Sequence, residues 1–173
     1  MKKVVLLVLC LMSAGASFAA SNAGVFKLSL WNNLAIAAPA NTQTIHGIDF
    51  GIGSHTNEVY GVQLDLVMAQ TRYELRGVSA AWLISLAEDV TGAQWAAFTK
   101  NTHLTGAQLG LVNLSGRHVS GAQLGFFNQA EDMNGLQFGF VNYAKQIYGL
   151  QIGILNIAEN GWFPAMVLVN GRF

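Results

Sequence analysis

The chain has 173 residues, of which 9 are basic and 9 are acidic, and 52% are apolar. Charges this sparse, without a run of either sign, exclude the clustered lysines and arginines of a nucleic-acid-binding surface. Beyond the N-terminal 20 residues, no apolar stretch approaches the roughly 20 residues of a transmembrane helix, because the apolar side chains are dispersed at alternating positions.

The N-terminus predicts a secretory signal peptide over residues 1–20. Met1-Lys2-Lys3 is basic, residues 4–12 are apolar, and small residues follow, so we expect cleavage after Ala19 or Ala20. The single cysteine, Cys10, lies inside the apolar run and is expected to belong to the signal rather than to a lipid-attachment site. Export without any further cysteine is typical of a bacterial envelope protein. Residues 21–173 are then predicted to form a single β-repeat domain.

Near the start of this domain, residues 25–31 alternate between apolar and polar side chains and predict a first strand. From Gly47 onward the sequence then repeats a unit of 14–16 residues, with repeats over about 47–160. A fixed period this short is typical of stacked or meandering β units. The residues that define the repeat are Gly106, Gln108, Gly110, Asn113, Gly121, Gln123, Gly125, Asn128, Gly135, Gln137, Gly139, Asn142, Gly149, Gln151, Gly153 and Asn156.

Within a unit numbered from its first, or lead, glycine, positions 2, 4 and 6 are apolar, whereas positions 1, 3 and 5 are Gly, Gln and Gly. This alternation predicts a β-strand with one apolar face and one polar or small face. A helix is disfavoured because each glycine would cost about 1 kcal/mol relative to alanine. Polar turn residues at positions 10 to 12 predict one turn per unit and a strand of about ten residues, such as 119–129.

The last segment, residues 162–173, is predicted to be an amphipathic strand that ends in Phe173. Such an ending is similar to the assembly signal of bacterial outer-membrane barrels, and we therefore interpret Phe173 as a possible membrane-assembly signal. With the first strand and the eight units, it gives about ten strands, an even number as in such barrels.

The main fold prediction is therefore all-β, an antiparallel meander that closes as a small outer-membrane-type β-barrel of about ten strands. The alternative is a β-solenoid with one 14–16-residue coil per repeat, in which the glutamines and asparagines form hydrogen-bonded ladders. The single polar turn per unit favours the barrel, since a coil needs two corners unless Gly110 and its equivalents supply the second. The common direction in which all units read favours the solenoid.

The repeat resembles that of a family of bacterial "surface repeat-containing" proteins, whose units read like Gly-Leu-Gln-Leu-Gly-Leu-Val-Asn after a signal peptide. The resemblance covers roughly Gly47 to Asn156 and implies an envelope or surface location, with no known reaction to transfer. The units at Gly77 and Gly92 depart most from the pattern, since the second glycine and the asparagine are replaced, by Ala81, Ala96, Ile84 and Thr99.

No catalytic, cofactor-binding or metal site is predicted. The histidines lack the spacing of metal ligands and are expected in solvated loops, at His46, His55, His103 and His118. The acidic pairs at 88–89 and 131–132 are adjacent on the chain and therefore point to opposite faces, so we expect solvated turns there.

Asp49 and Asp65 share the polar face of the early units, and Arg76 immediately precedes Gly77. In a barrel they would line the lumen and pair or tune ion passage, whereas in a solenoid that face would be the wet exterior. A minor hypothesis is a lipid-modifying site built from His46, Asp49 and Ser54.

The function expected from the sequence is that of an exported bacterial envelope or outer-membrane surface protein with a structural or surface role. It is not expected to be an enzyme, to need a cofactor or to bind nucleic acid, and outer-membrane lipid is the expected partner. The alternative is a secreted or surface-attached β-solenoid that acts as a binding or adhesion module.

Overall fold

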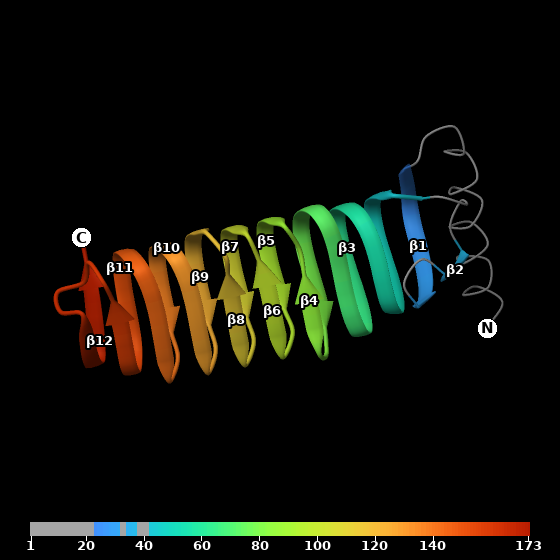
Figure 1. Ribbon diagram of the computed structural model, residues 1–173. Coiled ribbons are helices and arrows are strands. Elements are labelled where there is room, and N and C mark those ends of the chain that lie inside the picture. The colour runs from blue at the N-terminus through green and yellow to red at the C-terminus, as the bar shows by residue number, and fades with distance from the viewer. Residues whose placement is uncertain (1–22, 32–33, 38–41) are drawn as a thin grey trace.

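A computed structural model describes residues 23–31, 34–37 and 42–173, in which all regular structure is β (Figure 1). The chain winds into an elongated stack of coils, and equivalent strands of successive coils pair in parallel. The fold is a β-solenoid, so the alternative prediction is confirmed. The prediction of an antiparallel barrel is wrong, because neighbouring repeats run in the same direction. The predicted signal peptide lies outside the described residues.

Strand β1 (Ala23–Trp31) matches the first predicted strand and pairs with β2 (Leu34–Ala37) and with β3 (Thr44–Ala81), which winds through the first coils. The strand predicted at 119–129 is divided between two strands by a bend. The remaining strands are β4 (Ile84–Leu86), β5 (Asp89–Trp95), β6 (Phe98–Asn101), β7 (His103–Leu109), β8 (Val112–Ser115), β9 (His118–Leu124), β10 (Phe127–Phe138), β11 (Val141–Ala158) and β12 (Ala165–Arg172).

Each coil has two corners. In the middle of the stack, β5, β7 and β9 form one sheet and β4, β6 and β8 form the other, and β10 continues both. The chain bends between the sheets at Gly110-Leu111 and its equivalents, which we call the first corner, and again at the polar turn, the second corner. The second glycine of the repeat therefore supplies the corner that the polar turn signals alone did not reveal.

The register also corrects one detail of the repeat. Ser85, rather than Ile84, lies in line with Thr99 and Asn113. The coil that opens at Gly77 is one residue longer than the coil that opens at Gly92. This extra residue lies before Ser85, at the first corner around Trp82 and Leu83. The units at Gly77 and Gly92 nevertheless belong to the stack, since these two glycines pair with each other and Gly92 pairs with Gly106.

The lead glycines fix the stacking of the coils. All eight have a φ between 134° and 153°, a conformation that is essentially restricted to glycine. A Cβ built on Gly121 would lie 1.9 Å from the carbonyl oxygen of Gly106, and Gly77, Gly92 and Gly106 would meet the preceding lead glycine at the same distance. Only a residue without a side chain fits at this position.

Strand β12 ends the stack by pairing antiparallel to β11. The side chain of Phe173 is 87% exposed, and its ring centroid lies 6.0 Å from that of Trp162. The interpretation of Phe173 as an assembly signal depended on the barrel. The solenoid instead gives this terminal strand the role of a cap.

Replacing Gly121 with alanine is expected to lower the free energy of unfolding by more than about 2 kcal/mol, because the methyl group clashes with backbone and the φ is strained. The matched control is Gly116→Ala, where the nearest heavy atom to the added Cβ is 3.7 Å away. Denaturant unfolding followed by circular dichroism measures both. Equal stability of the two variants would contradict the stacking role of the lead glycine.

Candidate functional site: a polar interior and an apolar edge

The two faces of the repeat are placed opposite to the expectation for a solenoid. The glutamines at position 3 and the asparagines at position 8 point into the coil and are fully buried, whereas the apolar side chains at positions 4 and 6 largely point outward. The polar face is therefore the interior rather than the wet exterior. Buried amides are tolerated only when their hydrogen bonds are satisfied, and stacking in register provides that satisfaction.

The glutamines form one ladder along the stack. The Nε2 of Gln123 donates to the Oε1 of Gln108 at 2.8 Å, and Gln137 and Gln151 each donate to the preceding glutamine at 2.7 and 2.8 Å. The same Nε2 of Gln123 also donates to the backbone carbonyl of Gln129 at 3.1 Å. Each amide thus joins two coils and the two sheets of its own coil.

The asparagines form a second ladder that runs in the opposite direction. The Nδ2 of Asn113 donates to the Oδ1 of Asn128 in the following coil at 2.8 Å, and Asn128 and Asn142 continue the series at 2.8 Å. Asn128 also donates to the carbonyl of Phe138 at 3.0 Å, beside the first corner. The asparagine ladder therefore satisfies backbone carbonyls next to the bend.

The rest of the interior, toward the second corner, is apolar. A row of buried side chains, each two residues before the next lead glycine, packs against small alanines at position 10. This cluster contains Val59, Leu75, Val90, Leu104, Val119, Met133, Ile147, Ala130, Ala144 and Ala158. Amide side chains thus fill the part of the coil near the first corner, and apolar side chains fill the part near the second corner.

The asparagine ladder is tested by Asn128→Ala. The change removes the acceptor of Asn113 and the donor to Asn142 and leaves a cavity, so we expect a loss of about 2 kcal/mol or more in the free energy of unfolding. Gln129→Ala, at the exposed neighbouring position, should change it by less than about 0.5 kcal/mol. Urea unfolding of both variants decides the matter, and a null effect of Asn128→Ala would mean that the ladder does not stabilise the stack.

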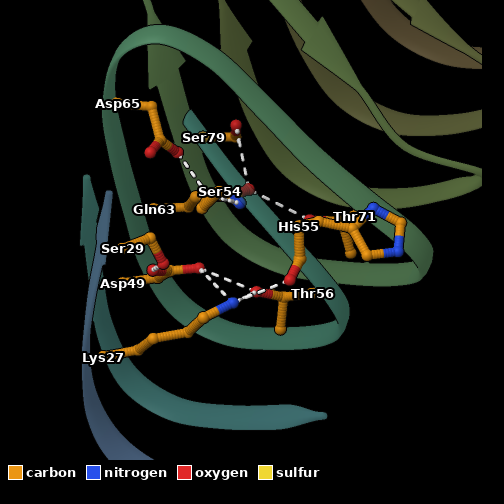
Figure 2. A network of polar contacts seen from close by, with 10 residues as sticks. All are labelled: Lys27, Ser29, Asp49, Ser54, His55, Thr56, Gln63, Asp65, Thr71 and Ser79. Atoms are coloured by element: carbon orange, nitrogen blue, oxygen red, sulfur yellow. Dashed lines mark hydrogen bonds and ion pairs between the residues drawn. The ribbon is translucent and has the colours of Figure 1, made fainter. Parts of the chain in front are cut away.

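A cluster of buried charges lies at the N-terminal end of this polar interior (Figure 2). The Nζ of Lys27 lies 3.9 Å from the Oδ2 of Asp49 and donates to the Oγ1 of Thr56 at 2.9 Å. Asp65 accepts a hydrogen bond from the Oγ of Ser54 at 2.5 Å. Ser54 in turn accepts one from the Nε2 of Gln63 at 2.6 Å, so the polar interior continues into this cluster.

Asp65 has a raised pKa in this cluster. Burial raises its pKa to about 7, and the hydrogen bond from Ser54 opposes that shift only in part. Burial also lowers the pKa of Lys27, against the attraction of Asp49. The Oδ1 of Asp65 has no hydrogen-bond partner within the described structure. One lysine beside two aspartates leaves an excess negative charge, which protonation of Asp65 removes.

The sequence hypotheses about these residues are only partly met. Asp49 and Asp65 do share one polar space, but Arg76 lies outside it and forms a surface ion pair with Glu74 at 2.6 Å. The lipid-modifying set is not assembled, because His46 is exposed and stacks on Tyr60 whereas Asp49 and Ser54 are buried. With its members buried among themselves, the charge cluster is part of the scaffold.

The stability of the protein is expected to depend on pH through Asp65. Between pH about 4 and 7 the folded chain keeps a proton that the unfolded carboxyl, with its ordinary pKa of 3.8, has lost. The free energy of unfolding therefore falls as the pH rises through this window, by at most about 1.4 kcal/mol per pH unit. Asp65→Asn should flatten this slope and the exposed control Glu88→Gln should not, in denaturant titrations at several pH values. An unchanged slope in Asp65→Asn would assign it to another group.

The second corner carries the exposed charges, as predicted for solvated turns. Asp89 lies 2.7 Å from the Nδ1 of His103, and Lys145 lies 3.2 Å from Glu131. Among the described residues, no group of three or more histidine, cysteine, aspartate or glutamate side chains is arranged to hold a metal ion. We call this side the charged edge, and it contains Arg72, Glu74, Arg76, Glu88, Asp89, Lys100, His103, Arg117, His118, Glu131, Asp132, Lys145 and Glu159.

The opposite side of the solenoid is apolar from end to end. In every coil opened by a lead glycine from Gly47 to Gly149, the first seven residues contain no charged side chain except the buried Asp49 and Asp65. We call the exposed part of this surface the apolar edge. It consists of Ile48, Phe50, Ile52, Leu64, Leu66, Val78, Trp82, Leu83, Trp95, Leu109, Leu111, Phe126, Phe138, Phe140, Ile154 and Leu155.

A groove of about 630 Å³ lies in the C-terminal half of the apolar edge. Its walls are side chains at positions 4 and 6, including Phe126 and Phe140, whose rings stack with centroids 4.3 Å apart. The second glycine of each coil contributes to its lining, and Leu168 and Val169 of β12 complete it. Every residue that lines the groove is apolar or glycine.

The sequence already contained the signal for this edge, in the uncharged even positions of every unit, but the choice of the barrel assigned that face to an outer lipid-facing wall. Within the part of the chain that the structure describes, no helix is long and apolar enough to span a membrane. No family model, curated protein or solved structure matches this chain.

Proposed function

We propose that this protein is an exported, surface-attached β-solenoid that works as a non-catalytic binding module, with the apolar edge as its binding surface. The observation that carries the proposal is the exposure of large apolar side chains along the whole solenoid, for example Leu111 at 63% and Ile154 at 59%. Soluble monomers rarely expose contiguous apolar surface beyond a few hundred Å², and a larger patch marks an interaction site.

The scaffold suits a binding role. Two amide ladders and a row of lead glycines hold each coil in register with the next, so the apolar side chains project from a regular, repeated backbone. Repetition of this kind gives an extended surface in which each coil adds a similar contact.

The distribution of ionisable groups supports binding over catalysis. A catalytic site needs a nucleophile, an acid or a base next to a cavity that a substrate can enter. Here the groove is lined by apolar residues and glycine. The buried Lys27 pairs with Asp49, the buried Asp65 accepts a hydrogen bond from Ser54, and the charged edge consists of solvated side chains. The predicted export and the resemblance to surface-repeat proteins supply the proposed location.

The proposal is tested by weakening the apolar edge in cells. We expect Phe126→Gln/Phe140→Gln to shift most of the protein from the envelope fraction to the soluble fraction, since two large exposed apolar contacts are lost. The matched control, Arg117→Gln/Lys145→Gln on the charged edge, should fractionate like the unaltered protein. Circular dichroism of the purified variants checks folding. Identical fractionation of both folded variants would show that the apolar edge is not the binding surface.

A further inference from the structure

We infer that the occupant of the apolar edge is lipid hydrocarbon, so that the solenoid lies along a membrane surface with its axis in the membrane plane. The apolar edge is immersed in the lipid and the charged edge faces water. This inference rests on the proposed function, because it names the partner of the same surface.

The absence of polar recognition groups separates hydrocarbon from a small molecule or a protein partner. Ligand pockets combine apolar walls with a few polar groups that fix orientation, and protein interfaces carry about one hydrogen bond per 100–200 Å². On the apolar edge, the exposed side chains offer only the indole N–H groups of Trp82 and Trp95 as donors. A surface with so little capacity for hydrogen bonds fits an occupant that needs none.

The shape of the edge separates lipid from a second copy of the chain. Exposed apolar side chains lie on both sides of the first corner, as Leu109 before the bend, Leu111 at the bend and Leu155 on the following sheet show. The edge therefore wraps around the first corner as a convex ridge, which the groove beside Phe126 and Phe140 indents in its C-terminal half. Two rigid convex ridges contact each other along one flank and leave the other flank in water, whereas fluid acyl chains cover both flanks.

Backbone groups at the first corner form hydrogen bonds within the protein. Hydrocarbon offers no hydrogen bonds, so every peptide group that enters it needs an internal partner. At the first corner, the N–H of Gly125 donates to the carbonyl of Phe138 and the N–H of Phe126 donates to that of Leu111. The carbonyl of Phe138 also accepts the Nδ2 of Asn128 from inside the coil. The asparagine ladder thus donates hydrogen bonds to backbone carbonyls of the ridge from inside the coil.

The dimensions agree with attachment along the surface. Eight coils at about 4.8 Å per strand spacing give a ridge of roughly 35 Å, which engages a membrane over its whole length. Trp82 and Trp95, with ring centroids 6.1 Å apart, lie on this ridge, and tryptophan is enriched where protein meets the lipid interface. The ridge itself carries no exposed charge, so attachment is driven by apolar burial rather than by attraction to anionic headgroups.

The test uses the purified protein and vesicles that contain no other protein. In flotation assays it should bind phosphatidylcholine vesicles and mixed phosphatidylcholine/phosphatidylglycerol vesicles to the same extent, with little change at high salt. Phe126→Gln/Phe140→Gln should reduce the bound fraction about tenfold, while Arg117→Gln/Lys145→Gln should not.

Fluorescence quenching by lipids with brominated acyl chains tests the orientation. A variant with Trp31→Phe and Trp162→Phe keeps the two ridge tryptophans, and its emission should be strongly quenched. A second variant, with all four tryptophans replaced by phenylalanine and Arg117→Trp added, places the only tryptophan on the charged edge and should be quenched several-fold less. Equal quenching of the two would overturn the orientation.

Envelope fractionation keeps this inference separate from the proposed function. Retention in the envelope that depends on Phe126 and Phe140, without binding to any vesicle, overturns the lipid inference and leaves the proposed function standing. Formation of a dimer that the same double variant abolishes, again without vesicle binding, also overturns it and assigns the ridge to a second copy. If neither envelope retention nor vesicle binding differs between the apolar-edge variant and the charged-edge variant, both proposals are overturned.

Discussion

The close approach of successive lead glycines is the constraint on which the rest of the structure depends. Because a Cβ at Gly121 would collide with the carbonyl oxygen of Gly106, each coil lies directly on the preceding one with no side chain between them. That contact fixes the register, and the register brings Gln123 over Gln108 and Asn128 over Asn113. A shift of one residue would exchange the inward and outward faces of the strand and leave the amides without partners.

Satisfied amides allow the protein to exchange the usual places of polar and apolar side chains. A buried glutamine is costly when unpaired, but here a ladder amide such as Gln137 is hydrogen-bonded to its neighbours in the stack and to the backbone. The interior is therefore filled by apolar side chains mainly toward the second corner, where Val119, Met133 and Ile147 pack. The outer apolar positions are left free for an interaction, which connects the internal hydrogen bonds to the proposed binding role.

The sequence predicted much of this arrangement and missed specific parts of it. Period-two alternation and the regular spacing of glycines predicted the strands and the coil length, because both are local properties. The choice between barrel and solenoid failed because the first corner is formed by apolar residues such as Gly110-Leu111, which lack the polar signature of a turn. The buried cluster of Lys27, Asp49 and Asp65 could not be predicted from the sequence, because Lys27 lies outside the repeat. The pairing of β1 with β3 places Lys27 beside Asp49. The apolar edge was visible as a pattern, but its exposure depends on which face the coil closes around.

The opposite directions of the two ladders have a consequence for the length of the molecule. Glutamine amides donate toward the N-terminus and asparagine amides donate toward the C-terminus, so the dipoles of the two columns oppose each other. Adding a coil lengthens both columns by one amide each and builds up little net dipole, which makes the stack tolerant of repeat duplication or loss. Its length is then set by its ends: β12 turns antiparallel, Leu168 adopts a φ of 70°, and the Oε1 of Gln151 has no partner in the described chain. Proteins of this architecture are therefore expected to differ in the number of coils while keeping the same cross-section and the same kind of cap.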